Sequence, residues 1–179
     1  MDQAMPNWAF RGMTFFFRIR DAIEPRARVL QEVQLEPGFH VLDYGCGPGA
    51  YIPAIAERVT GRGRVYALDL HPLAVRRVQA LARRRGLDQV RTIRSDCQTG
   101  LPDESVDVVL LYDILHMLSE PQAVLAELNR VLKPGGTLSV HDPHIGEKAV
   151  VSGVTEGGLF ALAGKGERTV RFHKSIGGR

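Results

Sequence analysis

The sequence predicts an α/β protein built on a doubly wound, mostly parallel, seven-stranded sheet that ends in an antiparallel hairpin. Two observations predict this fold. From residue 39 onward, short apolar or β-branched runs alternate with helical patterns, which is typical of a parallel sheet wrapped by helices. The last two runs, 159–163 and 169–173, flank a turn-rich Gly-Lys-Gly segment and therefore predict a hairpin.

The five strands that precede the hairpin are short and end in polar or turn residues. The fourth is aliphatic around Asp107, as expected of a central strand buried on both faces. We expect these strands at residues 39–43, 64–69, 90–94, 106–111 and 137–140.

The helices between the strands have clear ends. Helices are expected at residues 51–59, 73–85 and 121–132, and the second of them stops at Gly86, a natural C′ residue. The Lys-Pro-Gly-Gly run at 133–136 is expected to form the turn into the fifth strand. A short Gly-punctuated stretch then leads to the hairpin and leaves little material for a cap over that side of the sheet.

The chain divides into three parts in this interpretation. Residues 1–38 predict an N-terminal helical appendage that is rich in aromatics, either a cover for one face of the sheet or a lid. Residues 39–174 form the single domain that 179 residues support, and residues 175–179 form a flexible tail.

The composition favours a soluble, cytoplasmic protein. The chain is 44% hydrophobic and 24% charged, with a net charge of +3, and no apolar run approaches the roughly 20 residues of a membrane-spanning helix. No stable membrane insertion is therefore expected. The arginines clustered at residues 76–85 lack interleaved aromatics, so that they predict a solvated helix face and no nucleic-acid partner. The two cysteines have no metal-ligand spacing, and no metal is expected.

A glycine-rich turn, Asp43-Tyr44-Gly45-Cys46-Gly47-Pro48-Gly49, follows the first predicted strand. Glycines at a strand-to-helix turn let the backbone approach a ligand closely. The pattern suits a nicotinamide cofactor as well as S-adenosylmethionine. Asp69, at the end of the second strand, is placed to accept hydrogen bonds from a ribose diol in either case.

Two further acids distinguish these cofactors. Asp43 stands two residues before the first glycine, where it would repel a pyrophosphate but suit an ammonium group and a sulfonium. Asp96 follows the third strand and can accept a hydrogen bond from an adenine amino group. The pair favours S-adenosylmethionine.

Five segments in order resemble the motif series of class I methyltransferases, and most closely the small-molecule branch that includes ubiquinone and menaquinone C-methyltransferases. They are residues 41–49, 67–69, 95–97, 115–118 and 132–138. The resemblance covers most of the chain and implies the Rossmann-like methyltransferase fold with S-adenosylmethionine as cofactor. It also implies cofactor contacts for the side chains or backbone of Asp43, Gly45, Cys46, Gly47, Asp69, Leu70, Asp96, Cys97 and Tyr112.

The candidates for a general base lie after the fourth and fifth strands. Histidine can take a proton near neutral pH, and His116, His141 and His144 are all expected at the active edge of the sheet. Asp113 and Asp142 accompany them there. The acceptor is expected to be a small molecule of unassigned atom type, with its pocket covered by the N-terminal aromatics or by the partner subunit of a homodimer. A cofactor-binding protein without catalysis and a nicotinamide-dependent oxidoreductase remain the alternatives.

Overall fold

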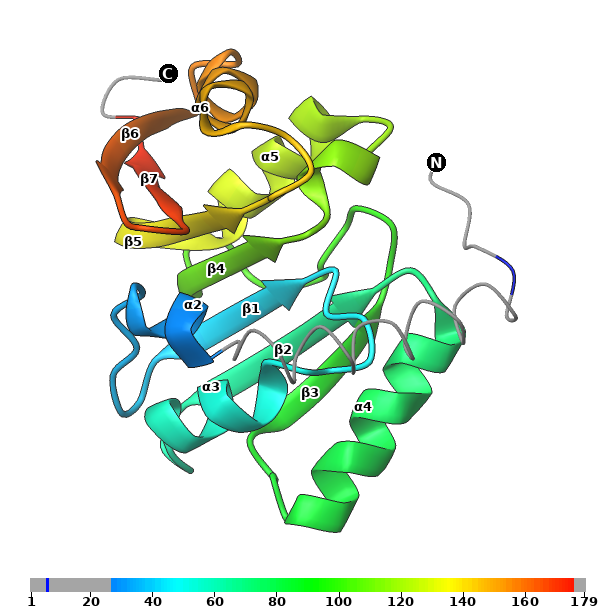
Figure 1. The fold of residues 1–179 in the computed structure, drawn as a ribbon. Helices are drawn as coiled ribbons and strands as arrows, with labels where there is room; N and C mark the ends of the chain where they lie inside the picture. The colour runs from blue at the N-terminus through cyan, green and yellow to red at the C-terminus, as the bar shows by residue number, and fades with distance from the viewer. Residues whose placement is uncertain (1–5, 7–26, 176–179) are drawn as a thin grey trace.

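The computed structural model describes Pro6 and residues 27–175, and these form one sheet covered by helices on both faces (Figure 1). The sheet has seven strands in the order β3-β2-β1-β4-β5-β7-β6. Neighbours from β3 through β5 are parallel, whereas β7 is antiparallel to both β5 and β6. The predicted fold class is confirmed. The strands are β1 (His40–Tyr44), β2 (Arg64–Asp69), β3 (Val90–Arg94), β4 (Val106–Tyr112), β5 (Leu132–His141), β6 (Phe160–Lys165) and β7 (Val170–Lys174).

The strand order reverses beside β1, because the chain runs outward through β2 and β3 and then returns to place β4 on the other side of β1. Open α/β sheets bind ligands in the crevice at such a reversal, outside the carboxyl ends of the strands. The two central strands are almost wholly buried, as their apolar sequences require. The fold therefore positions a site at the carboxyl ends of β1, β2 and β4.

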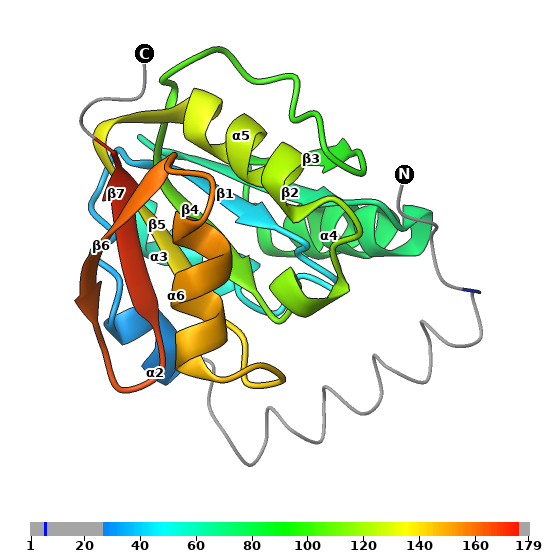
Figure 2. The ribbon, with the colours of Figure 1, turned by 90° about the horizontal axis from the view of Figure 1, so that it is seen from above.

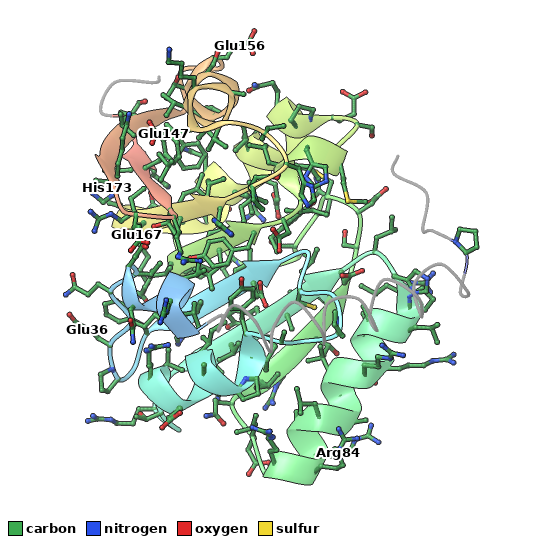
Figure 3. All side chains as sticks on the ribbon, viewed as in Figure 1. Glu36, Arg84, Glu147, Glu156, Glu167 and His173 are labelled. Carbon is green, nitrogen blue, oxygen red and sulfur yellow. The ribbon has the colours of Figure 1, made fainter. Side chains whose placement is uncertain are left out.

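The helices form two layers around the sheet (Figure 2). One core contains apolar side chains of α2 (Ala27–Gln31), α3 (Ile52–Val59) and α4 (Pro72–Arg85). The other contains those of α5 (Pro121–Val131) and α6 (Glu147–Thr155). Helix α4 ends as predicted at Gly86, which adopts a left-handed conformation with φ of 60°. Its outer face carries exposed arginines, among them Arg84 (Figure 3).

Two local expectations were wrong. The 133–136 run is not a separate turn, because β5 already begins at Leu132, which pairs with Val106 before the register shifts. The Gly-punctuated stretch forms α6, whose Val150 and Val154 pack into the core, so that this side of the sheet is covered after all. Glycine lowers helix propensity, but burial of two valines on one face offsets that cost.

The structure describes only part of the predicted N-terminal appendage. Residues 8–26 of the expected helical appendage and residues 176–179 of the expected tail lie outside the described residues, and the division into these parts stays a prediction. Residues 27–31 form α2, which packs Val29 and Leu30 into the core. Among residues 27–175, none of the helices combines the length and apolar character that crossing a membrane requires.

A buried carboxylate on α5 holds the loop between β3 and β4 in place. Glu127 Oε1 accepts hydrogen bonds from the backbone N–H of Thr99 at 2.8 Å and from its hydroxyl at 2.6 Å. Arg130 donates to both carboxylate oxygens. Burial alone would raise the pKa of Glu127, but the hydrogen bonds from Arg130 and Thr99 outweigh it and hold the pKa at about 2.

This network makes a prediction for acid stability. Because the folded-state pKa of Glu127 lies below the unfolded value of 4.5, its stabilisation is complete above pH 4.5 and is lost as the pH falls toward about 2. We expect Glu127→Gln to lower the free energy of unfolding at neutral pH by about 2 kcal/mol. Denaturant unfolding at neutral and acid pH should show the two proteins converging below pH 4.5. An unchanged difference at low pH would contradict this assignment.

Candidate functional site

The glycine turn leaves the carboxyl end of β1 with a tightly constrained backbone. Gly45 and Gly49 have φ of 77° and 84°, values that L side chains rarely adopt. The backbone N–H groups of Gly45 and Cys46 both donate to the Leu68 carbonyl at 2.9 Å, which ties the turn to β2. A Cβ on Gly49 would lie 2.7 Å from Val78 Cγ2, so that only glycine lets α4 pack this closely.

Asp69 joins the glycine turn to the start of α4. Its Oδ2 accepts the Gly47 N–H at 2.8 Å, and its Oδ1 accepts the His71 N–H at 2.7 Å. Burial raises the pKa of Asp69, although these two hydrogen bonds oppose the shift. Each oxygen of an ionised carboxylate has two acceptor sites, so that both oxygens keep one for a ligand hydroxyl.

The turn lies in a field of negative charge. Burial is the main cause of the strongly raised pKa of the Cys46 thiol, and the nearby carboxylates of Asp43 and Asp69 raise it further. Asp43 is only 2% exposed. The field that opposes a thiolate here would also oppose a pyrophosphate and would favour a cation. This charge distribution fits a sulfonium with an α-ammonium group, as the sequence predicted.

The adenine side of the predicted site lies beyond β2 and β3. Asp96 and Cys97 follow β3 and are partly buried, as is Leu70 after β2. Tyr44 reaches this loop from the end of β1 and donates its hydroxyl to the Asp96 carbonyl at 2.8 Å. Tyr44 was missed in the sequence interpretation, although its place directly before the glycines was a usable signal.

The donor set of this edge suits S-adenosylmethionine. Asp69 offers carboxylate oxygens for a ribose, and Asp43 and Asp69 together offer negative charge for the cationic end. Among the described residues no heavy atom outside the turn lies within 4 Å of the position that a Cβ would take on Gly47. The backbone there is open to a ligand. The individual cofactor contacts stay predictions.

Tyr112, at the end of β4, is turned into the protein. Its hydroxyl shares a hydrogen bond of 2.9 Å with the Ser139 hydroxyl, and its ring meets those of Tyr51 and His141 edge-on at centroid distances of 5.2 and 6.0 Å. Burial raises the pKa of Tyr112 well above its usual value. The residue therefore acts as a neutral packing group between the glycine turn and β5.

Two of the three candidate histidines meet at one carboxylate. Asp142 Oδ2 lies 2.8 Å from His116 Nδ1 and 3.0 Å from the His116 backbone N–H. Its Oδ1 accepts the backbone N–H of His144 at 3.2 Å, and the imidazoles of His116 and His144 lie 4.4 Å apart. An ionised carboxylate only accepts, so that His116 Nδ1 carries a proton and Nε2 is left to accept one. The geometry is that of an oriented base.

The third candidate, His141, is not part of this group. Its Nδ1 lies 2.7 Å from the Arg168 carbonyl in the turn between β6 and β7. In the described part of the chain, no group of three or more His, Cys, Asp or Glu side chains could hold a metal ion.

A cavity of about 670 Å³ lies beside His141. It is bounded by α2, the segment after β5, the start of α6 and the β6–β7 turn; Glu147 and Glu167, both labelled in Figure 3, are among its lining residues. The cavity is also lined by Asp142 and His144 of the histidine group and by Tyr51, two residues after the glycine turn. Its size is in the range of small-molecule sites.

Comparisons with known proteins agree with this geometry. Residues 42–140, more than half of the chain, match the family model described as a methyltransferase domain. Demethylmenaquinone methyltransferase of Geobacillus stearothermophilus is 31% identical over 125 residues, covering 69% of this chain and 53% of that protein. Aklanonic acid methyltransferase DauC of Streptomyces sp. strain C5 is 30% identical over 145 residues, covering 79% and 62%. This chain spans about half the length of these relatives.

A solved structure matches over nearly its whole length. The crystal structure of a SAM-dependent methyltransferase from Aquifex aeolicus superposes with a TM-score of 0.72 and 27% identity, covering 88% of this chain and 96% of that one. The family match spans the glycine turn, β2, β3, β4 and most of β1 and β5, and it includes every cofactor residue that the sequence predicts. The chain belongs to the methyltransferase domain family, and its cofactor is S-adenosylmethionine.

Proposed function

We propose that this protein transfers a methyl group from S-adenosylmethionine to a small molecule held in the cavity beside β5. The observation that supports this most is that the cavity is lined by Tyr51, two residues after the glycine turn, and by Asp142, which contacts His116. One volume thus touches both the segment after the glycine turn and the carboxylate that orients His116. Several of the matched relatives carry names of small-molecule methyltransferases, which agrees with this acceptor class.

The residues of the chain divide the work in this proposal. When bound, the cofactor supplies an activated methyl group on a sulfonium. Asp69 holds the ribose, Asp43 balances positive charge, and Asp96 orients the adenine. The walls of the cavity align the nucleophile, which is most of what an in-line displacement needs. His116 Nε2 takes the proton that the acceptor loses, and Asp142 stabilises the resulting imidazolium.

The proposal is tested by binding and by product release. Calorimetry should show S-adenosylmethionine binding with a Kd of roughly micromolar, about −8 kcal/mol, and no comparable binding of NADH. A panel of phenols, thiols, amines and hydroquinones should then contain an acceptor that releases S-adenosylhomocysteine. Tight cofactor binding without any release would favour a non-catalytic binding protein, and NADH binding in its place would favour an oxidoreductase.

A further inference from the structure

Glu32, the residue after α2, is hydrogen-bonded to the turn between β6 and β7. The Glu32 carboxylate accepts the Thr169 hydroxyl at 2.8 Å and the Thr169 N–H at 2.9 Å. It also accepts the backbone N–H of Arg168 at 3.1 Å. Burial alone would raise the pKa of Glu32, but these hydrogen bonds outweigh it, and the pKa is lowered. The carboxylate is therefore ionised at neutral pH and fixes the β6–β7 turn.

The turn that Glu32 fixes determines the state of His141. The backbone carbonyl of Arg168 lies 2.7 Å from His141 Nδ1. A carbonyl can only accept, so that Nδ1 must carry the proton. In the neutral ring, Nε2 then keeps its lone pair. Both amide groups of the turn that are next to this carbonyl donate to Glu32, so that displacing Glu32 frees the acceptor of His141 as well.

His141 belongs to the wall of the cavity, which also has valines from three elements. Val140 precedes it in β5, Val29 faces the cavity from α2, and Val150 from α6. Tyr112 packs edge-on against its ring. Within the described residues, no hydrogen-bond partner is found for Nε2. The lining also carries His144 and the carboxylates of Asp142, Glu147 and Glu167, so that His141 Nε2 is one of several acceptors that a molecule in the cavity meets.

We infer that Glu32 is a positioning residue that holds His141 in its Nδ1-protonated tautomer, so that Nε2 accepts a hydrogen bond from a hydroxyl on the acceptor molecule. This inference rests on the proposed function, because it names the class of molecule that the same cavity takes. It assigns recognition to His141 and leaves proton removal to His116. Glu32, which directly follows α2, also joins that helix to the substrate wall.

Two variants disturb the same carboxylate by different routes. Glu32→Gln keeps the size of the side chain but removes one acceptor oxygen and the charge. Gly166→Ala keeps Glu32 but places a Cβ 2.0 Å from the position of Glu32 Oε2, which the flexible carboxylate must leave. Glu36→Gln is the matched control, since Glu36 is exposed in the segment after α2. If one variant fails to fold, the other still displaces the carboxylate.

The first readout is the tautomer of His141 in the full chain with S-adenosylhomocysteine, from long-range proton–nitrogen NMR spectra at mildly alkaline pH. We expect Nδ1–H in the wild type and in Glu36→Gln, and a shift toward Nε2–H in Glu32→Gln and Gly166→Ala. A merely structural brace between α2 and the hairpin would leave the tautomer unchanged. An Nε2–H wild-type ring, or an unchanged tautomer in both variants, would overturn the inference.

The second readout is the preference for a hydroxyl. We expect para-cresol to bind the cofactor-loaded wild type about fivefold more tightly than para-methylanisole, which has the same ring but no donor. The preference should disappear in Glu32→Gln and persist in Glu36→Gln. Equal binding of both probes by the wild type would overturn the hydroxyl assignment. A wild-type protein that does not bind S-adenosylmethionine would instead refute the proposed function, so that the two failures are distinguishable.

Discussion

Asp69→Ala is expected to weaken S-adenosylmethionine binding by about 100-fold or more. The substitution removes the acceptors that hold Gly47 N–H at 2.8 Å and His71 N–H at 2.7 Å. It also removes the proposed ribose contact. Two charge-assisted hydrogen bonds from the ribose hydroxyls to Asp69 would contribute about 3 kcal/mol to binding, which corresponds to the expected factor. Calorimetric titration of the purified variant measures it directly.

Asp88→Ala is the matched control for this experiment, because Asp88 is an exposed aspartate in the loop after α4. It should bind the cofactor like the wild type. Asp69→Asn should fall between the two, since an amide offers one acceptor oxygen where two backbone donors are present. An Asp69→Ala protein that is folded and retains wild-type affinity would show that the ribose is held elsewhere.

Asp142→Asn is expected to lower kcat by about 10²- to 10⁴-fold while the Kd for S-adenosylmethionine stays within about twofold. Asp142 Oδ1 and Oδ2 receive donors from His116 and His144. Asparagine replaces one carboxylate oxygen by an NH₂ group, which donates and does not accept. His116 therefore loses its preferred tautomer and the stabilisation of its protonated form. Release of S-adenosylhomocysteine with the acceptor found in the panel gives the rate.

The matched control here is Asp88→Asn, which makes the same chemical change on the exposed loop and should leave kcat unchanged. His116→Gln should lose as much rate as Asp142→Asn, and the double variant should lose little more, because the two residues act as a unit. Additive losses would show that Asp142 supports the loop and does not act through His116. A rate independent of both residues would identify a proton acceptor outside this pair.

Most of the fold could be predicted from local patterns. The bounds of β2 and β3 were predicted to the residue, and α4 begins one residue earlier than expected. Apolar periodicity and glycine or proline at the ends are short-range signals, and they suffice where the element packs against its neighbours in the usual way. Helix α6 was not predicted because Gly153 lies within it, and its amphipathic character is evident only from the burial of Val150 and Val154.

In the candidate site, too, the residues marked by local patterns were predicted and those brought together by tertiary contacts were not. The glycine turn and the acids at the strand ends were predicted because parallel strands bring their carboxyl ends to one edge of the sheet. Glu32 was not predicted, since its partners Arg168 and Thr169 are more than 130 residues away and nothing local marks it. The three histidines were predicted as one set. The structure separates them, with His116 and His144 at Asp142 and His141 at the β6–β7 turn.

The sequence by itself determined the fold class, the cofactor turn and the family, because each is indicated by local patterns and motifs. The tertiary structure alone decided which imidazole meets a carboxylate and which meets a carbonyl. It also decided where the cavity lies. Those outcomes depend on hydrogen bonds between segments far apart in the chain, whose geometry exists only once the β6–β7 hairpin has docked against α2 and β5.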